Sequence, residues 1–163
     1  MIDNTINDFI FDQNNNLIIT SPFSGLEVLT NQGSWILFNS ATNLELPFFM
    51  NSLKNVVIDN ENNLWISTIE NGLVKYANNT WEFYNEENSG LIDNKINCLK
   101  YDNINNHLWV GTETQGLILM DLNSMNIENN YYADFPINIF FTNEYLNINT
   151  FETGNLKVYN SKG

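Results

Sequence analysis

Short apolar segments separated by polar turns recur along the chain. Between residues 53 and 84 there are four of them, Leu53–Ile58, Leu64–Thr68, Leu73–Tyr76 and Trp81–Tyr84. They are rich in β-branched, aromatic and aliphatic residues, and turn formers in "DNENN", "ENG" and "ANNT" divide them. Segments this short, without a 3.6-residue period, are typical of β-strands. The pattern therefore predicts a four-stranded unit, such as a propeller blade, rather than alternating strands and helices.

The same unit recurs four times, and the last copy is incomplete. The segment "DNENNLWISTIENGLVKY" from Asp59 is echoed by "DNINNHLWVGTETQGLILM" from Asp102 and, more weakly, by "DQNNNLIITSPFSGLEVL" from Asp12. A glycine with a threonine four or five residues before it marks each copy. These pairs are Thr20 and Gly25, Thr68 and Gly72, Thr112 and Gly116, and Thr150 and Gly154. A segment that recurs in this way is a structural unit that buries its faces by stacking on its neighbours.

The second strands of the copies indicate how the units stack. The runs "LIIT", "LWIST" and "LWVGT" are nearly continuous and apolar, as expected of strands that are covered on both faces. Blades stacked face to face supply that cover, with the tryptophans in the core. The small residues Ser67 and Gly111, at equivalent places, are expected to leave room for a large side chain of the next blade. We therefore expect an all-β fold, a β-propeller of four-stranded blades.

The length of the chain predicts an incomplete ring. One domain spanning 1–163 is expected, with blades at approximately 5–40, 53–86, 95–132 and 136–163, the last of them partial. Propeller repeats of about 44 residues leave room for three full blades and part of a fourth. Three arrangements remain: a small four-bladed ring, an open arc that forms a homodimer, and a fragment of a longer propeller. The last two are favoured, because an open arc exposes apolar blade faces and an unpaired strand edge.

One stretch resembles a known repeat family. The segment "NSGLIDNKINCLKYDNINNHLWVGTETQGLILMD", from Asn88 to Asp121, is similar to the two-component regulator propeller repeat, and the copy from Leu53 to Tyr84 matches almost as well. The first copy departs from the family pattern, because it lacks the tryptophan and carries Pro22 in the following loop. The resemblance implies a large, often seven-bladed propeller. It also implies the extracytoplasmic sensor portion of a histidine kinase that recognises glycans or their breakdown products.

Composition narrows the classes of partner. Nineteen acidic residues against six lysines, with no arginine, give a net charge of −13. Nucleic-acid binding is therefore not expected, because affinity for the phosphate backbone comes from clustered cations. A cationic partner, a metal ion or a neutral sugar is easier to accommodate. No stretch approaches the roughly 20 apolar residues of a membrane span, and no export signal is present. Taken literally the chain is soluble and unexported, whereas the family resemblance implies a periplasmic location.

Few residues are suited to catalysis or metal binding. The only histidine, His107, is expected in a turn, and any catalytic triad of serine or cysteine would have to use it. The sequence has no zinc-type spacing and no glycine-rich phosphate loop, so we expect no cofactor. Cys98, the only cysteine, lies in an inner-strand pattern and is expected to be buried. The turns that open at Asp12 and Asp59 resemble the start of a calcium loop but lack its later ligands, so turn chemistry is favoured.

One set of loops is expected to bind a ligand. Between the second and third strands of three copies lies one glutamate each, at Glu70, Glu113 and Glu152. In a propeller these loops share one face with the connections between blades, where ligands bind near the axis. Three carboxylates there suit a cation, a basic peptide or sugar hydroxyls, and a solvated acidic rim is the alternative. Aromatic residues between the blades are expected either to stack on a sugar or to pack between blades; they are Tyr84, Tyr132, Phe48, Phe49 and Tyr131.

These observations favour a non-catalytic module that binds a glycan or a protein partner, as part of a sensor or regulator. The first alternative is an enzyme, because the repeats also look like those of the propeller lyases that open streptogramin antibiotics. Such chemistry needs a general base, and the sequence offers His107 alone. The second alternative is a degenerate remnant with no dedicated ligand.

Overall fold

The structure is a computed structural model. It describes residues 4–43, 46–47, 50, 52–124, 126–128, 138–142 and 145–149. The chain divides into two compact units, Met1–Tyr131 and Tyr132–Gly163, and each is described by itself.

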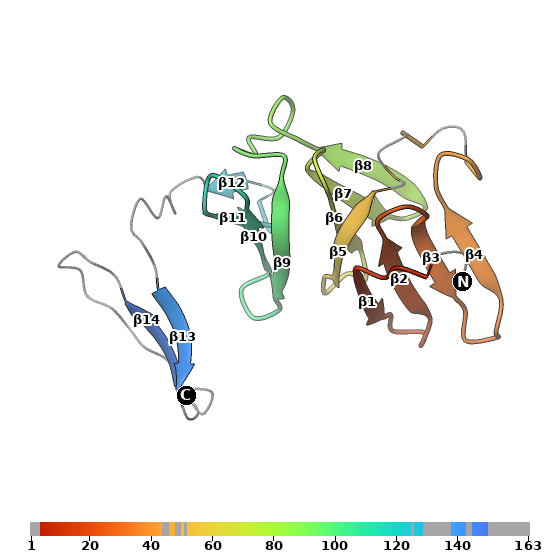
Figure 1. The fold of residues 1–163 in the computed structure, drawn as a ribbon, viewed down its shortest axis with the longest axis horizontal. Coiled ribbons are helices and arrows are strands. Elements are labelled where there is room, and N and C mark those ends of the chain that lie inside the picture. The colour runs from red at the N-terminus through yellow and green to blue at the C-terminus, as the bar shows by residue number, and fades with distance from the viewer. Residues whose placement is uncertain are drawn as a thin grey trace. The chain divides into compact units, whose positions relative to one another are not determined.

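The described residues form β-strands connected by turns (Figure 1). The strands are β1 (Asp8–Phe11), β2 (Leu17–Ser21), β3 (Gly25–Leu29), β4 (Trp35–Phe38), β5 (Leu53–Ile58), β6 (Leu64–Thr68), β7 (Leu73–Ala77), β8 (Thr80–Tyr84), β9 (Ile96–Asp102), β10 (His107–Thr112), β11 (Leu117–Asp121), β12 (Asn126–Glu128), β13 (Asn138–Thr142) and β14 (Tyr145–Asn149).

The first unit contains three four-stranded antiparallel sheets, each formed by four strands in sequence order. We call β1–β4 blade 1, β5–β8 blade 2 and β9–β12 blade 3. The strands of blade 2 lie where the hydrophobic pattern predicts them: β5 and β6 have the predicted bounds, and β7 and β8 are each one residue longer. The second unit contains an antiparallel pair, β13 and β14. The expected all-β fold of four-stranded blades is confirmed, with three full blades in the first unit.

Two apolar clusters join the blades. The cluster between blades 1 and 2 consists of Ile18, Leu26, Leu46, Met50, Leu53, Val56, Leu64, Ile66 and Val74. The cluster between blades 2 and 3 consists of Trp65, Leu73, Leu91, Ile96, Leu99, Leu108, Val110, Ile118 and Met120. Every residue of β6 is buried, because Leu64 and Ile66 pack toward blade 1 and Trp65 packs toward blade 3. The face of a blade that points toward the preceding blade is called its upstream face. The face that points toward the following blade is called its downstream face.

The turn between the first and second strands of each blade is built on asparagine. Asn15, Asn62 and Asn106 hold equivalent places, with φ of 61°, 65° and 57°. Asparagine adopts this left-handed backbone more readily than most residues. In blade 2 the Asp59 carboxylate accepts hydrogen bonds at 2.9 Å from both the backbone N–H and the side-chain amide of Asn63. These bonds fix the point at which the inner strand ends.

The repeated threonine closes the turn between the second and third strands. The Thr68 hydroxyl donates to the carbonyl oxygen of Gly72 at 3.0 Å, and Thr112 makes the same bond in blade 3. In blade 1 this place belongs to Ser21, whose hydroxyl accepts hydrogen bonds from turn N–H groups. The expectation that Thr20 is the equivalent of Thr68 and Thr112 is therefore wrong by one residue. The Thr20 hydroxyl instead donates to a carbonyl oxygen of β5 at 2.8 Å and so joins blade 1 to blade 2.

Several packing expectations are wrong. A side chain at Gly111 would collide with Cys98 on the neighbouring strand β9, so the free space is filled from within the same blade. Ser67 is buried and accepts a hydrogen bond from the Asn55 N–H at 2.9 Å, and the expectation that it leaves room for the next blade stays a prediction. Cys98 is exposed, because it lies on the downstream face of β9 together with Gly111. Trp35 is 46% exposed, on the last strand of blade 1.

An aspartate before β9 joins the inter-blade connection to the loop between β10 and β11. Asp93 is 7% exposed and accepts hydrogen bonds from the N–H of Lys95 at 2.8 Å and from the hydroxyl and N–H of Thr114 at 2.8 and 2.9 Å. Burial alone would raise the pKa of Asp93, but these hydrogen bonds, assisted by the charge of Lys95, hold that pKa below its usual value. Asp93 lies within the segment "GLIDNK". In the sequence, its acidity alone did not distinguish it from the other aspartates and glutamates.

Replacing Ile66 by Ala should lower the free energy of unfolding by about 2–5 kcal/mol, because the side chain is 0% exposed between two blades. Ile104→Ala is the matched control, since Ile104 is 88% exposed, and its effect should stay within about 0.5 kcal/mol. Urea denaturation followed by circular dichroism measures both. Equal losses in the two variants would contradict the arrangement of the core.

Asp93→Asn should cost about 1–3 kcal/mol of stability at pH 7, because it removes charge-assisted hydrogen bonds. A depressed carboxyl pKa stabilises the fold above the unfolded pKa of about 4, and that stabilisation is lost as the pH falls through the lower folded pKa. The difference between wild type and variant should therefore be complete at pH 7 and shrink below about pH 4. Denaturation curves at several pH values test this, with the exposed Glu70→Gln as control. A difference that does not depend on pH would count against the role of the charge.

Candidate functional site

The predicted acidic loops are only partly free to receive a ligand. Glu70, in the loop between β6 and β7, is exposed. Glu113, in the equivalent loop of blade 3, forms an ion pair with Lys95 at 3.5 Å, and its backbone N–H donates to the Lys95 carbonyl oxygen at 2.8 Å. Glu152 lies outside the described residues. The acidic site therefore stays a prediction, and one of its carboxylates already has a cationic partner.

The aromatic residue Tyr84 packs within the protein rather than standing free. Its ring lies 5.4 Å from the ring of Trp65, centroid to centroid, and its hydroxyl donates to the Glu82 carboxylate at 2.6 Å. Burial of Tyr84, together with the hydrogen bond to Glu82 and its negative charge, raises the pKa of the tyrosine hydroxyl. Tyr132, like Phe48, Phe49 and Tyr131, lies outside the described residues. A stacking role at these positions stays a prediction.

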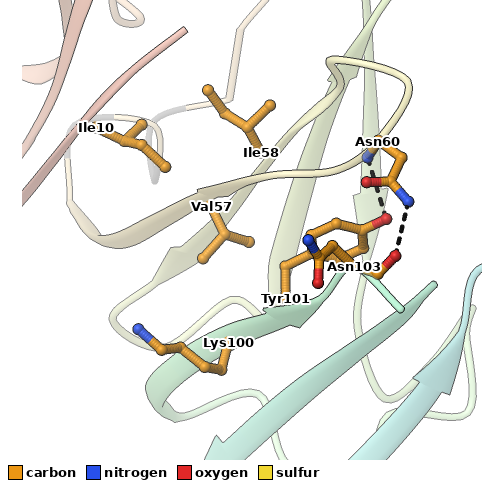
Figure 2. A pocket seen from close by; sticks show the side chains of 7 residues that line it. All are labelled: Ile10, Val57, Ile58, Asn60, Lys100, Tyr101 and Asn103. Carbon is orange, nitrogen blue, oxygen red and sulfur yellow. Dashed lines mark hydrogen bonds between the residues drawn. The ribbon is translucent and has the colours of Figure 1, made fainter. Parts of the chain in front are cut away.

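A groove of about 490 Å³ lies at the opposite end of the inner strands, where the first hairpin of each blade turns. Figure 2 shows its lining. The lining residues come from all three blades of the first unit: Ile10, Val57, Ile58, Asn60, Lys100, Tyr101 and Asn103. Because the inner strands β1, β5 and β9 all contribute, the groove runs across the blades rather than within one of them.

The lining residues occupy equivalent places in the repeat. Each of the three full copies has an aspartate at the end of its inner strand. In blades 2 and 3 the groove takes the two residues before the aspartate and the one after it, and in blade 1 it takes one residue before it. They are Ile10 before Asp12; Val57, Ile58 and Asn60 around Asp59; and Lys100, Tyr101 and Asn103 around Asp102. Sequence analysis missed this surface because it searched the loops for charged side chains. The repeated aspartate was the signal, since it places its neighbours at one end of the inner strands.

The polar side of the groove is held by hydrogen bonds between blades 2 and 3. The Tyr101 hydroxyl accepts from the Asn60 N–H at 3.1 Å and donates to the Asn106 side-chain oxygen at 2.7 Å. The Asn60 side-chain amide donates to the Asn103 carbonyl oxygen at 3.1 Å, and Figure 2 shows both bonds of Asn60. These contacts fix the hairpins relative to each other. The polar wall of the groove is therefore held by hydrogen bonds between two blades.

The opposite side of the groove is apolar and carries one cation. Ile10, Val57 and Ile58 form the apolar side, and Lys100 stands at its edge, away from the cluster around Asn60 (Figure 2). Among the described residues, none forms an ion pair with Lys100. An apolar wall with a few placed polar groups is the usual build of a small-molecule site. The groove can take a ligand with an apolar face and hydroxyl or anionic groups.

The residues considered for metal binding or catalysis are engaged elsewhere. Asp12 and Asp59 accept hydrogen bonds from the N–H groups of their own turns, which supports turn chemistry over a calcium loop. In the part of the chain that the structure describes, no group of three or more His, Cys, Asp or Glu side chains is placed to hold a metal ion. His107 begins β10, and its Nε2 lies 4.0 Å from an Asp121 carboxylate oxygen. Hydrogen bonds from Asn123 and Ser124 hold the pKa of Asp121 below its usual value.

No family model and no curated protein matches the sequence. Solved structures match the fold. The extracellular domain of a proposed hybrid two-component system from Bacteroides thetaiotaomicron has 22% sequence identity and a TM-score of 0.67, covering 92% of this chain and 20% of its own. A second such domain from that organism has 18% identity and a TM-score of 0.67, covering 98% of this chain and 23% of its own.

A lyase has the same fold over a shorter part of the chain. Virginiamycin B lyase from Staphylococcus aureus has 12% identity and a TM-score of 0.59, with 76% of this chain and 40% of the lyase covered. This chain spans about a fifth of the length of the two extracellular domains. No helix among the described residues is long and apolar enough to cross a membrane. At these identities the comparisons establish the fold, and the chain has the β-propeller fold that the repeat resemblance implies.

Proposed function

We propose that the chain is a non-catalytic binding module of a two-component sensor that works outside the cytoplasm and recognises a saccharide. The groove across the inner strands of three blades is the observation that carries this proposal. The likeness in fold to extracellular domains of proposed two-component systems supports the location and the sensory role. The specific ligand follows from the chemistry of the groove.

The groove suits a sugar in size and in chemistry. Its volume of about 490 Å³ is within the range of about 300–1,000 Å³ that small-molecule sites occupy. A sugar ring presents an apolar face, which fits the wall of Ile10, Val57 and Ile58, and hydroxyl groups, which fit the amide of Asn103. The Lys100 ammonium offers three donors to a hydroxyl or a carboxylate. A uronic acid therefore satisfies more of the groove than a neutral sugar does.

Saturation-transfer difference NMR with a panel of neutral and uronic-acid disaccharides tests this proposal. We expect saturable binding to the wild type, with tighter binding of the acidic sugars. Lys100→Met should weaken that binding about tenfold or more, because a hydrogen bond to a charged group contributes about 1.5–3 kcal/mol. Lys95→Met is the matched control: Lys95 is a half-exposed lysine paired with Glu113 at the other end of the blades, and its loss should leave the affinity unchanged.

Two results would contradict this assignment. If Glu70→Gln and Glu113→Gln abolish binding while Lys100→Met does not, the ligand binds at the acidic loops. If no sugar in the panel produces a saturable signal, the proposal of a saccharide ligand fails, and a protein ligand becomes the next candidate.

The second candidate function is a lyase, and the likeness in fold to virginiamycin B lyase is the observation that favours it. A β-elimination requires a general base, and His107, near Asp121, is the histidine available for it. Under the proposed binding function, incubation with virginiamycin B should give no product detectable by mass spectrometry. Turnover that is lost in His107→Ala and retained in Lys95→Met would instead establish an enzyme.

A further inference from the structure

Blade 1 has a smaller residue at the position where blade 2 buries a tryptophan. Trp65 is the second residue of β6 and lies six residues after Asp59, and Ile18 is the second residue of β2 and lies six residues after Asp12. Both side chains pack on the downstream face of their blade, Ile18 against blade 2 and Trp65 against blade 3. Blade 1 therefore lacks the indole ring that fills the equivalent contact in blade 2.

A cavity of about 190 Å³ lies beside Ile18, between blades 1 and 2. Most of its lining is apolar and comes from both blades: Ile18, Leu26, Ile36, Phe38, Leu64 and Tyr76. A cavity of about 150 Å³ lined by leucine, isoleucine and phenylalanine stays dry and takes up benzene. Ile36, on the last strand of blade 1, is 44% exposed, so the cavity is open to solvent there. The cavity is therefore suited to an aromatic ring rather than to water.

The residues around the Trp65 ring have equivalents around the cavity. The ring lies 5.4 Å from the ring of Tyr84, centroid to centroid, and the Lys75 ammonium lies 5.3 Å from its centroid. Phe38 and Val28 hold the same places in the strand register of blade 1, and both line the cavity. The cavity therefore lies where the indole ring of blade 1 would lie. Its wall is more apolar than that around Trp65, because a valine replaces the lysine.

The aspartate of the first hairpin provides a hydrogen-bond acceptor at the cavity. In blade 2 the Trp65 Nε1–H donates to Asp59 Oδ2 at 3.0 Å, and a side-chain amide donates to the same oxygen at 2.9 Å. In blade 1 the Asn16 side-chain amide donates to Asp12 Oδ2 at 2.7 Å, and among the described residues no second group donates to that oxygen. Asp12 lines the cavity. Its carboxylate can therefore accept the hydrogen bond that the indole N–H supplies in blade 2.

We propose that this cavity binds an indole, or a similar flat aromatic ring with an N–H donor, whose N–H donates to Asp12. The packing of Trp65 against Tyr84 and its hydrogen bond to Asp59 are the model for this contact. The ring belongs either to a free indole compound or to a tryptophan side chain of a partner protein. The cavity shares no lining residue with the groove of the proposed sugar site, so this proposal does not depend on that one.

Isothermal titration calorimetry with indole and 1-methylindole tests the proposal. Indole should bind the wild type saturably, and 1-methylindole should bind about tenfold more weakly or worse, because it has the same ring without the N–H that a carboxylate would accept. N-acetyltryptophanamide distinguishes the two sources. Binding at least as tight as that of indole indicates a tryptophan side chain, and weaker binding indicates a free compound.

Ile18→Trp should abolish the binding of indole, because the new side chain fills the cavity from within the blade. The melting temperature of this variant should not fall, and it shows that the variant is folded. Ile104→Trp is the matched control, since Ile104 is 88% exposed and lies outside the cavity. Its affinity for indole should equal that of the wild type.

Asp12→Asn should weaken indole binding about tenfold or more and leave 1-methylindole binding unchanged, because it removes one acceptor oxygen and keeps another for the turn N–H groups. Asp102→Asn, at the equivalent place in blade 3, should leave both affinities unchanged. The proposal is overturned if the wild type does not bind indole saturably or binds both ligands equally. It is also overturned if folded Ile18→Trp binds indole like the wild type, or if Asp12→Asn weakens both ligands to the same extent.

Discussion

The second strand of each blade is apolar on both faces, and the rest of the structure depends on covering them. Every residue of β6 is buried, with Ile66 against blade 1 and Trp65 against blade 3. An isolated four-stranded sheet cannot bury both faces, so a blade is stable only between neighbours. The same requirement keeps the inner strands of successive blades side by side, and this is what creates a groove shared by three blades.

The hairpin built on aspartate and asparagine determines where that groove ends. The carboxylate of Asp59 binds turn N–H groups, and the left-handed Asn62 reverses the chain without strain on a bulky side chain. Because the turn is repeated, the residues beside the aspartate reach the same level in each blade. We expect substitution at these places to change the lining of the groove while the turn hydrogen bonds are kept. A repeat scaffold can therefore carry different side chains in the groove beside turns of the same kind.

Sequence analysis predicts the blades well because their strands bury apolar runs at a fixed spacing, and burial leaves a strong pattern. The strands of blade 2 lie within one residue of their predicted bounds. The environment of a single side chain is harder to predict, because its direction depends on the register of the strand. Thr20 lies one place from the residue that is equivalent to Thr68. Cys98 was expected to be buried, but it is exposed beside Gly111. The groove was missed for a different reason. Its residues are individually ordinary, and only the register of three strands brings Ile10 near Lys100.

Local charge, rather than net charge, is what favours the hairpin end of the blades for the proposed sugar acid. At the loop end, Lys95 pairs with Glu113, and Asp93 is occupied by hydrogen bonds, so little cationic character is left for a ligand. At the hairpin end, Lys100 borders an apolar wall, and no described residue forms an ion pair with it. Charges on the far side of the protein act weakly there, because the Debye length is about 8 Å at physiological salt. The strongly acidic net charge is therefore compatible with the proposed acidic ligand, because no carboxylate among the described residues pairs with Lys100.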